Sequence, residues 1–307
     1  MKDLRIIFMG TPEFAVPSLE ILVENKFQVV AVITAPDKPQ GRGQKLQPSP
    51  VKECALKYGL PVLQPTNLKS PEFQETLRSY RANLQVVVAF RMLPEAVWAM
   101  PEIGTFNLHA SLLPQYRGAA PINWAIINGE KETGVTTFFL KHEIDTGSII
   151  FQEKEPIDVN DTVGTLYDRL MKKGAQLVLK TVRAIEQENY PSVAQTESTE
   201  LKHAPKIFKE TCEINWNLSA EQVRNFIRGL SPYPAAWATL NGKVFKIFKA
   251  SIGSQNGVAS ILPGELRSDN KTYAEVRTAD GWISIDELQP EGKRKMTIQE
   301  YLVGNKF

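Results

Sequence analysis

The chain has 307 residues, of which 42% are hydrophobic and 23% are charged, and its formal net charge at pH 7 is +2. This composition excludes disordered, collagenous and coiled-coil proteins, and the length predicts two domains. No apolar stretch reaches the roughly 20 residues of a membrane helix and no signal peptide is visible, so we expect a cytoplasmic protein. Because the net charge is small, any nucleic-acid partner must be recognised by local basic segments.

Strand-like apolar segments alternate with helical segments through the first 150 residues. Strands are expected at Leu4–Met9, Gln28–Thr34, Leu84–Phe90, Thr105–Ala110 and Gly134–Leu140. Helices are expected at Pro12–Glu24, Glu53–Tyr58, Glu72–Arg81, Glu95–Met100 and Ala120–Asn128. Because segments such as 86–89 are apolar on both faces, the pattern predicts a Rossmann-like α/β fold. Its sheet would be mostly parallel, with helices on both faces.

The remainder of the chain predicts a long helix, a linker and a small β domain. Periodic apolar residues predict a helix over Thr162–Glu188, and the Pro-, Ser- and Thr-rich segment 190–206 is typical of a linker. Beyond it, one helix is expected at Ala220–Gly229 and strands at Glu213–Trp216, Ala236–Leu240, Val244–Ala250, Ala274–Arg277 and Trp282–Glu287. Short strands with one helix favour an OB-like β-barrel. The predicted domains are therefore 1–189 and 207–307, joined by the linker 190–206.

The turn after the first strand lacks a nucleotide-binding glycine pattern. It reads Met9-Gly10-Thr11-Pro12, whereas dinucleotide and triphosphate loops need several glycines before a helix. NAD or ATP held in such a loop is therefore not expected. The two cysteines, Cys54 and Cys212, and the three histidines suggest neither a disulfide framework nor a metal site.

The segment 106–114 carries the most informative polar residues. Asn107 and His109 alternate along a predicted strand, so they share one face at its carboxyl end, where open α/β sheets bind ligands. Asp145 follows the predicted neighbouring strand, and we expect it to approach His109. Such a set suits acyl transfer to an amine: the imidazole accepts a proton, the carboxylate stabilises the imidazolium, and the amide stabilises the oxyanion. From the residues alone, His109 could also be a core side chain and Asp145 a turn residue.

Longer motifs around these residues resemble the formyltransferases that use 10-formyltetrahydrofolate. They are Asn107–Pro114 with Tyr116–Ile122, Phe8–Pro17, Gly41–Lys52, Glu132–Thr136 and Leu288–Lys293. The resemblance covers essentially the whole chain. It implies that Asn107, His109 and Asp145 are the catalytic residues and that 10-formyltetrahydrofolate is the formyl donor. We expect that no metal takes part, because three histidines and two separated cysteines make no convincing zinc site.

The resemblance also implies where the folate lies. It places the folate at Ser111, Leu112, Leu113 and Pro114, with its pterin edge against main-chain groups of Phe90, Arg91, Met92 and Leu93 and of residues 141–144. Many members have Tyr-Gly where this chain has Phe90-Arg91, and a Met-Asp-x-Gly-Leu run where it has Lys141-His142-Glu143-Ile144. Recognition through the main chain would tolerate both differences. His142 has no obvious orienting partner in the sequence, so we interpret it as a solvated neighbour.

Within that family, Phe8–Pro17 and the loop 41–52 resemble the branch that formylates methionyl-initiator tRNA for translation initiation. The loop 35–47 carries Lys38, Arg42 and Lys45, opposed only by Asp37. A basic loop with glycines can reach the phosphates of an acceptor stem. The resemblance therefore implies folate and methionyl-initiator tRNA as substrates, with Arg42, Lys38 and Lys45 contacting the tRNA. We separately expect the protein to be a monomer.

Three other interpretations stay open at this point. A sugar-nucleotide formyltransferase would share the Asn-His-Asp set but would have no use for the basic loop. A hydrolase would release formate because water can replace the amine. A non-catalytic RNA-binding protein is the alternative from a different class, and it predicts a broken set, whereas Asn107, His109 and Asp145 are all present.

Overall fold

The computed structural model describes residues 1–40, 45–143, 145–196, 200–254 and 261–307. These residues form two compact units. The first comprises Met1–Arg117, Gly134–Glu155 and Tyr167–Lys202, and the second comprises Gly118–Thr133, Pro156–Leu166 and His203–Phe307. The predicted domain boundaries and the linker at 190–206 stay predictions.

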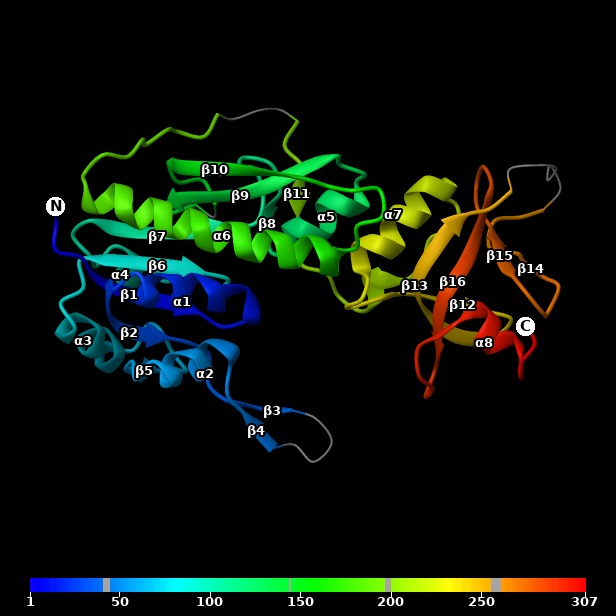
Figure 1. The fold of residues 1–307 in the computed structure, drawn as a ribbon, viewed down its shortest axis with the longest axis horizontal. Coiled ribbons are helices and arrows are strands. Elements are labelled where there is room, and N and C mark those ends of the chain that lie inside the picture. Colours follow the sequence, from blue (N-terminus) through cyan, green and yellow to red (C-terminus); the bar gives the residue numbers. More distant parts are fainter. Residues whose placement is uncertain (41–44, 144, 197–199, 255–260) are drawn as a thin grey trace. The chain divides into compact units, whose positions relative to one another are not determined.

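A seven-stranded sheet forms the centre of the first unit, in the order β10-β9-β7-β6-β1-β2-β5 (Figure 1). The strands are β1 (Arg5–Gly10), β2 (Gln28–Ile33), β5 (Val62–Leu63), β6 (Leu84–Val88), β7 (Gly104–His109), β9 (Glu132–Phe139) and β10 (Ile149–Pro156). The pairs from β7 to β5 are parallel, and β9 is antiparallel to β7. The predicted mostly parallel sheet is therefore confirmed.

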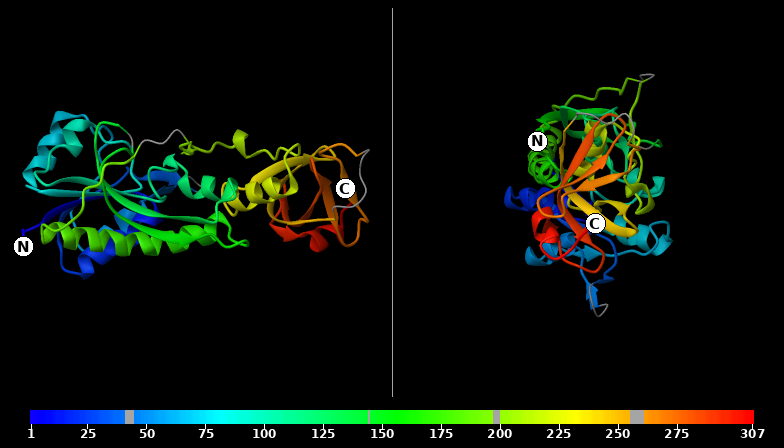
Figure 2. Two further views of the ribbon diagram at one scale, coloured as in Figure 1. Left: turned by 90° about the horizontal axis from the view of Figure 1, so that it is seen from above. Right: turned by 90° about the vertical axis from the view of Figure 1, so that its right-hand side faces the viewer.

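Helices cover both faces of this sheet. They are α1 (Val16–Glu24), preceded by the 3-10 turn η1 (Glu13–Ala15), α2 (Pro50–Lys57), α3 (Pro71–Ser79), α4 (Glu95–Trp98) and α6 (Val163–Glu186). On one face, Phe73 of α3 and Val97 of α4 pack against Met9 of β1. On the other face α6 runs along the strands (Figure 2). There Gly174 leaves space for the Leu108 side chain.

Capping residues explain where α2 and α3 begin. Ser49 and Ser70 precede these helices, and each hydroxyl accepts a hydrogen bond from the peptide N–H three residues later. A proline occupies the first turn in both cases, where its missing N–H has no helical partner. The Ser-Pro pairs therefore start the helices earlier than the expected starts at Glu53 and Glu72.

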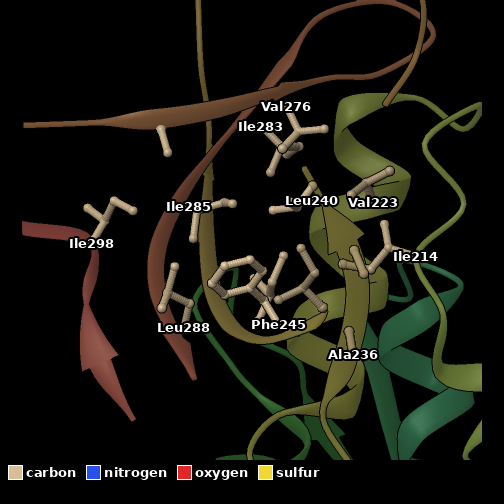
Figure 3. Close-up of a cluster of buried hydrophobic side chains, with 14 of the residues drawn as sticks. Ile214, Val223, Ala236, Leu240, Phe245, Val276, Ile283, Ile285, Leu288 and Ile298 are labelled. Atoms are coloured by element: carbon tan, nitrogen blue, oxygen red, sulfur yellow. The ribbon is translucent and has the colours of Figure 1, made fainter. Parts of the chain in front are cut away.

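The second unit contains a six-stranded antiparallel sheet with the half-barrel form of the predicted OB-like domain. Its strands are β12 (Ala236–Leu240), β13 (Lys243–Ile252), β14 (Leu266–Ser268), β15 (Ala274–Arg277), β16 (Trp282–Pro290) and β17 (Met296–Thr297). Its helical segments are α5 (Pro121–Ile127), η2 (Glu210–Cys212), α7 (Ala220–Leu230) and α8 (Ile298–Leu302). Phe245, Ile285 and Leu288 of the sheet and Val223 of α7 belong to one buried cluster (Figure 3).

Two short pairs of strands complete the described elements. The loop predicted at 35–47 contains a hairpin, β3 (Lys38–Gln40) with β4 (Lys45–Gln47). β8 (Arg117–Gly118) pairs with β11 (His203–Ala204). No helix in the described ranges is long and apolar enough to cross a membrane.

The predicted strand at Glu213–Trp216 is wrong. Only Glu213 forms a bridge, to Trp237, and the chain then turns because the N–H of Asn217 donates to the Asn215 side chain. Strand β10 was not predicted, because Gln, Glu and Lys interrupt its apolar residues. Three tryptophans of this unit lie in or against its core: Trp282 is buried, and Trp216 and Trp237 pack against the buried cluster.

An ion cluster ties β10 to α6. Glu155 is buried and contacts Arg169 Nε at 2.7 Å and Lys173 Nζ at 3.1 Å. Burial raises the pKa of the Glu155 carboxyl, but the hydrogen bonds from Arg169 and Lys173 outweigh it and hold the pKa below its ordinary value of 4.5. Because the folded-state pKa is lowered, the stabilisation is present above pH 4.5 and is lost as the pH falls through the folded-state value.

Replacing Glu155 by Gln is therefore expected to lower the free energy of unfolding at pH 7 by about 1–3 kcal/mol, since charged hydrogen bonds are lost. The difference from the wild type should shrink as the pH falls below 4.5. Urea unfolding at several pH values measures both effects. A constant difference across this range would contradict the assignment.

Candidate active site

Asn107 and His109 lie on one face at the carboxyl end of β7. The intervening Leu108 is buried on the opposite face, against Gly174 of α6. Asn107 is also the register partner of Phe138 on β9, so the strands that precede the two parts of the predicted site are neighbours. The sequence expectation for this placement is confirmed.

The His109 imidazole has a different partner at each nitrogen. Nε2 lies 2.8 Å from the carbonyl oxygen of Tyr116, and Nδ1 lies 3.9 Å from Oδ2 of Asp145. Because a carbonyl oxygen can only accept, Nε2 carries a proton, and in the neutral ring Nδ1 is the basic nitrogen. The His109 and Asp145 side chains are only 8% and 10% exposed, so solvent weakly screens the attraction between the carboxylate and a protonated imidazole. The atom that can accept a proton therefore faces the carboxylate.

Asp145 lies in a tight loop after β9. Its φ angle is +56°, in the left-handed region. Gly147 follows in the same loop, where a side chain would collide with the Phe139 carbonyl, so only glycine fits. Gln195 contacts the peptide carbonyls of this loop, and Arg117 contacts Gln195. The sequence indicated the approach of Asp145 to His109 but gave no signal for Gln195, which lies in the segment interpreted as a linker.

The amide of Asn107 remains available to a ligand. Its residue is half-buried, and its side chain forms no hydrogen bond within the described ranges. It lies on the same face as His109 and on the strand that neighbours the one before Asp145. An unpaired amide N–H in this position can stabilise a developing oxyanion.

The loop after β7 is held by buried hydroxyl groups. Thr136 Oγ1 donates to the Ser111 carbonyl at 2.6 Å and accepts from the Leu113 N–H at 3.2 Å. Gln152 Nε2 donates to the Leu113 carbonyl and to Thr136 Oγ1, both at 2.9 Å. The Ser111 hydroxyl donates to the Gln115 carbonyl at 2.6 Å. Ser111 and Leu113 are buried, while Leu112 and Pro114 are partly exposed beside them. These contacts fix the shape of one predicted folate segment.

The segment after β6 offers free peptide groups. No peptide group of residues 90–93 bonds to another peptide group in the described part of the chain. Phe90 and Leu93 pack against one buried cluster of hydrophobic side chains. Leu140, the residue directly after β9, packs against the same cluster. Met92 is exposed. Arg91 turns away to donate to the carbonyls of residues 65 and 66. A segment with apolar side chains and unpaired peptide groups suits a flat heteroaromatic edge.

His142 is more constrained than the sequence indicated. Its imidazole is largely exposed, as expected, but Nε2 lies 3.2 Å from Glu95 Oε1 and the ring stacks edge-on against Trp98 at 5.5 Å. The expectation that it lacks an orienting partner is therefore wrong, because α4 supplies two. The contacts also bring residues 141–143 beside residues 95–98. Ile144, the last residue of this predicted folate segment, lies outside the described residues.

Two of the three predicted tRNA-binding residues fall on the β3–β4 hairpin. Lys38 and Lys45 belong to its two strands, whereas Arg42 lies outside the described residues. The Asp37 carboxylate accepts two hydrogen bonds from Lys52 Nζ, at 2.7 and 2.9 Å, and one from Gln64. These hydrogen bonds hold the pKa of Asp37 below its ordinary value. The negative charge of Asp37 is thus compensated by Lys52 at the base of the hairpin, so it does not cancel the charges of Lys38 and Lys45.

An imidazole facing a carboxylate beside a free amide, at the carboxyl end of β7 in an α/β sheet, is an arrangement that suits group transfer. Residues 4–182 match the formyl transferase model, and residues 206–306 match the model of the formyl transferase C-terminal domain. The chain therefore belongs to the formyl transferase family, and it is an enzyme. No cluster of His, Cys, Asp and Glu that could hold a metal ion occurs among the residues that the structure describes.

Comparison with curated relatives shows members of the family to which this chain is similar in sequence. A methionyl-tRNA formyltransferase of Bacteroides fragilis is 54% identical over 99% of this chain and 95% of its own length. One from Phocaeicola vulgatus is 56% identical over 99% of this chain and 96% of its own. A crystal structure of an N-formyltransferase from Helicobacter canadensis, in complex with folinic acid and dTDP-3-aminofucose, shares the fold. It has a TM-score of 0.69 and 23% identity over 95% of this chain and all of its own.

Proposed function

We propose that this enzyme transfers the formyl group of 10-formyltetrahydrofolate to the α-amino group of methionyl-initiator tRNA. The product is N-formylmethionyl-tRNA, which serves translation initiation. The observation that carries the proposal is the basic Nδ1 of His109 facing Asp145, 3.9 Å away, on the same face as the free amide of Asn107. The 54–56% identity to methionyl-tRNA formyltransferases, over 99% of this chain, supports methionyl-initiator tRNA as the acceptor.

The three side chains divide the chemistry between them. The amine attacks the formyl carbon, and the carbonyl oxygen becomes negative as the new C–N bond forms. Asn107 donates its amide N–H to that oxygen. His109 Nδ1 accepts the proton that the amine loses, and the imidazolium can return a proton to the departing folate nitrogen as the old C–N bond breaks. Asp145 stabilises the imidazolium through its charge and fixes the direction of the ring.

The donor fits the segments around the site. Peptide groups of residues 90–93 would bind the pterin edge, in the segment that carries the apolar side chains of Phe90 and Leu93. The loop of Ser111–Pro114 would line the other side, since Thr136 and Gln152 hold its backbone in place. Ser111 would act by shaping this loop, because its hydroxyl already donates to the Gln115 carbonyl.

The basic segment 35–47 would bind the acceptor end of the tRNA through Lys38 and Lys45 of the β3–β4 hairpin and through Arg42. Phosphate contacts of this kind position the nucleic acid and depend on salt. We expect Arg42→Ala to raise the KM for tRNA several-fold and to reduce the slope of log KM against log salt by about 0.7–0.9. The KM for the folate donor should stay unchanged.

Lys57→Ala is a matched control for this prediction. Lys57 is an exposed cation on α2 that pairs with Glu20, away from the hairpin. Steady-state kinetics of both variants at three salt concentrations make the comparison. Equal effects of the two substitutions, or no effect of Arg42→Ala, would remove Arg42 from the tRNA site.

A sugar-nucleotide formyltransferase is the second candidate, because such an enzyme shares the fold at low identity. The basic hairpin with its neutralised Asp37 favours the tRNA acceptor. The decisive assay mixes the purified enzyme with 10-formyltetrahydrofolate and charged initiator tRNA and measures N-formylmethionyl-tRNA. Formylation of an amino-sugar nucleotide instead, or release of free formate, would overturn the proposal. We also propose that the enzyme acts in the cytoplasm as a monomer.

A further inference from the structure

One side chain joins the loop of the catalytic carboxylate to the loop that holds the catalytic histidine. The amide nitrogen of Gln195 donates to the carbonyl oxygen of Asp145 at 2.7 Å and to that of Gly147 at 2.9 Å. Its amide oxygen accepts from Nε and Nη2 of Arg117, at 3.2 and 2.7 Å. Because the two carbonyls can only accept and the guanidinium can only donate, the amide has one satisfied orientation.

The Asp145 loop needs such a partner. A non-glycine residue with a φ of +56° costs free energy, on the order of 1–3 kcal/mol, and persists only where its surroundings hold it. Gln195 binds the peptide carbonyls on both sides of Thr146, so it fixes the backbone from which the Asp145 side chain projects. A shift of this backbone would move the carboxylate away from Nδ1 of His109.

Two consecutive residues, Tyr116 and Arg117, help to position both His109 and Asp145. The Tyr116 carbonyl binds Nε2 of His109, and the adjacent Arg117 guanidinium binds Gln195. The segment that carries Gln195 is itself anchored on both sides. Val193 exchanges two peptide hydrogen bonds with Ile149, and the Lys202 carbonyl accepts from the Tyr116 N–H. The spacing between imidazole and carboxylate is therefore set through one connected network.

We propose that Gln195 is the positioning residue of the Asp145 carboxylate and that Arg117 keeps the Gln195 amide turned toward the Asp145 loop. The inference rests on the proposed function, because it assigns the carboxylate its role in formyl transfer. Neither side chain touches a reacting atom. Loss of Gln195 should therefore lower kcat and leave both KM values nearly unchanged.

The first test compares Gln195→Met and Gln195→Glu with Gln74→Met. The Met variant keeps the length but loses all four hydrogen bonds, and we expect kcat to fall roughly 10- to 100-fold. The Glu variant keeps the Arg117 contact but sets a carboxylate oxygen against two carbonyl oxygens, so it should not restore kcat. Gln74 on α3 also donates one hydrogen bond to a peptide carbonyl, of Lys69, and its variant should behave as wild type.

The second test separates positioning from general destabilisation. Single-turnover rates with excess enzyme are measured for Gln195→Met in the wild-type and in the Asp145→Asn background, together with the melting temperature of each variant. If Gln195 acts through the carboxylate, its substitution has little further effect once the carboxylate is gone. Additive losses, a large rise in either KM, or an unchanged kcat in Gln195→Met would overturn the inference. An inactive wild type would instead refute the proposed function.

Discussion

Replacing His109 by Ala is expected to lower kcat for formyl transfer by about 10²–10⁴-fold, the range that general acid–base catalysis contributes. The reason is that Nδ1 is the only basic nitrogen of the ring while Nε2 donates to Tyr116, so no other ring atom can accept the amine proton. tRNA binding should stay nearly unchanged, because the basic hairpin is separate from β7 in the sheet. Product formation and filter binding measure the two quantities.

His203→Ala is the matched control for this substitution. His203 is exposed on β11 and lies outside the catalytic set, so its variant should keep the wild-type rate. Added imidazole should restore part of the rate of His109→Ala, since it can occupy the vacated space and accept the proton. Equal loss of transfer and tRNA binding in His109→Ala, without rescue by imidazole, would indicate misfolding and contradict the assigned role.

The sequence predicted the parts of the site that depend on strand geometry. The alternation of Asn107 and His109 and the adjacency of β7 and β9 follow from the strand period and from the short connection between them. The helix at 220–229 was likewise predicted, and the structure shows Ser219 before it in a capping box with Gln222.

The partners that orient the site could not be predicted in this way. The Tyr116 carbonyl reaches His109 through a backbone with a φ of +59°, which no side-chain pattern encodes. Gln195 reaches Asp145 across 50 residues of chain, from a segment without periodicity. Contacts of this kind are made by turns and peptide groups, so they appear only once the backbone is in place. The orienting contacts of His142 were missed because its partners, the Glu95 and Trp98 side chains, lie on α4, a separate element of the chain.

The role of Asn107 can be tested by introducing a negative charge at this position as well as by removing the amide. Asn107→Ala removes the free amide N–H and is expected to lower kcat by about 10²–10³-fold, as the loss of one oxyanion donor does. Asn107→Asp keeps the size but places a carboxylate where negative charge develops, so its kcat should be lower still. Both substitutions are at a half-buried position with no hydrogen bond to lose in the described ranges, so stability should change little.

Asn83 provides the comparison for Asn107. It also belongs to the parallel-sheet unit, but its side chain accepts from the Arg5 N–H and donates to the Asp3 carbonyl at the opposite ends of the strands. Asn83→Ala should therefore lower the melting temperature and leave kcat near the wild-type value, the reverse of Asn107→Ala. A kcat for Asn107→Asp equal to that of the wild type would show that the amide does not face the developing charge. The oxyanion would then have to be stabilised by peptide N–H groups, and the division of roles between Asn107 and His109 would fail.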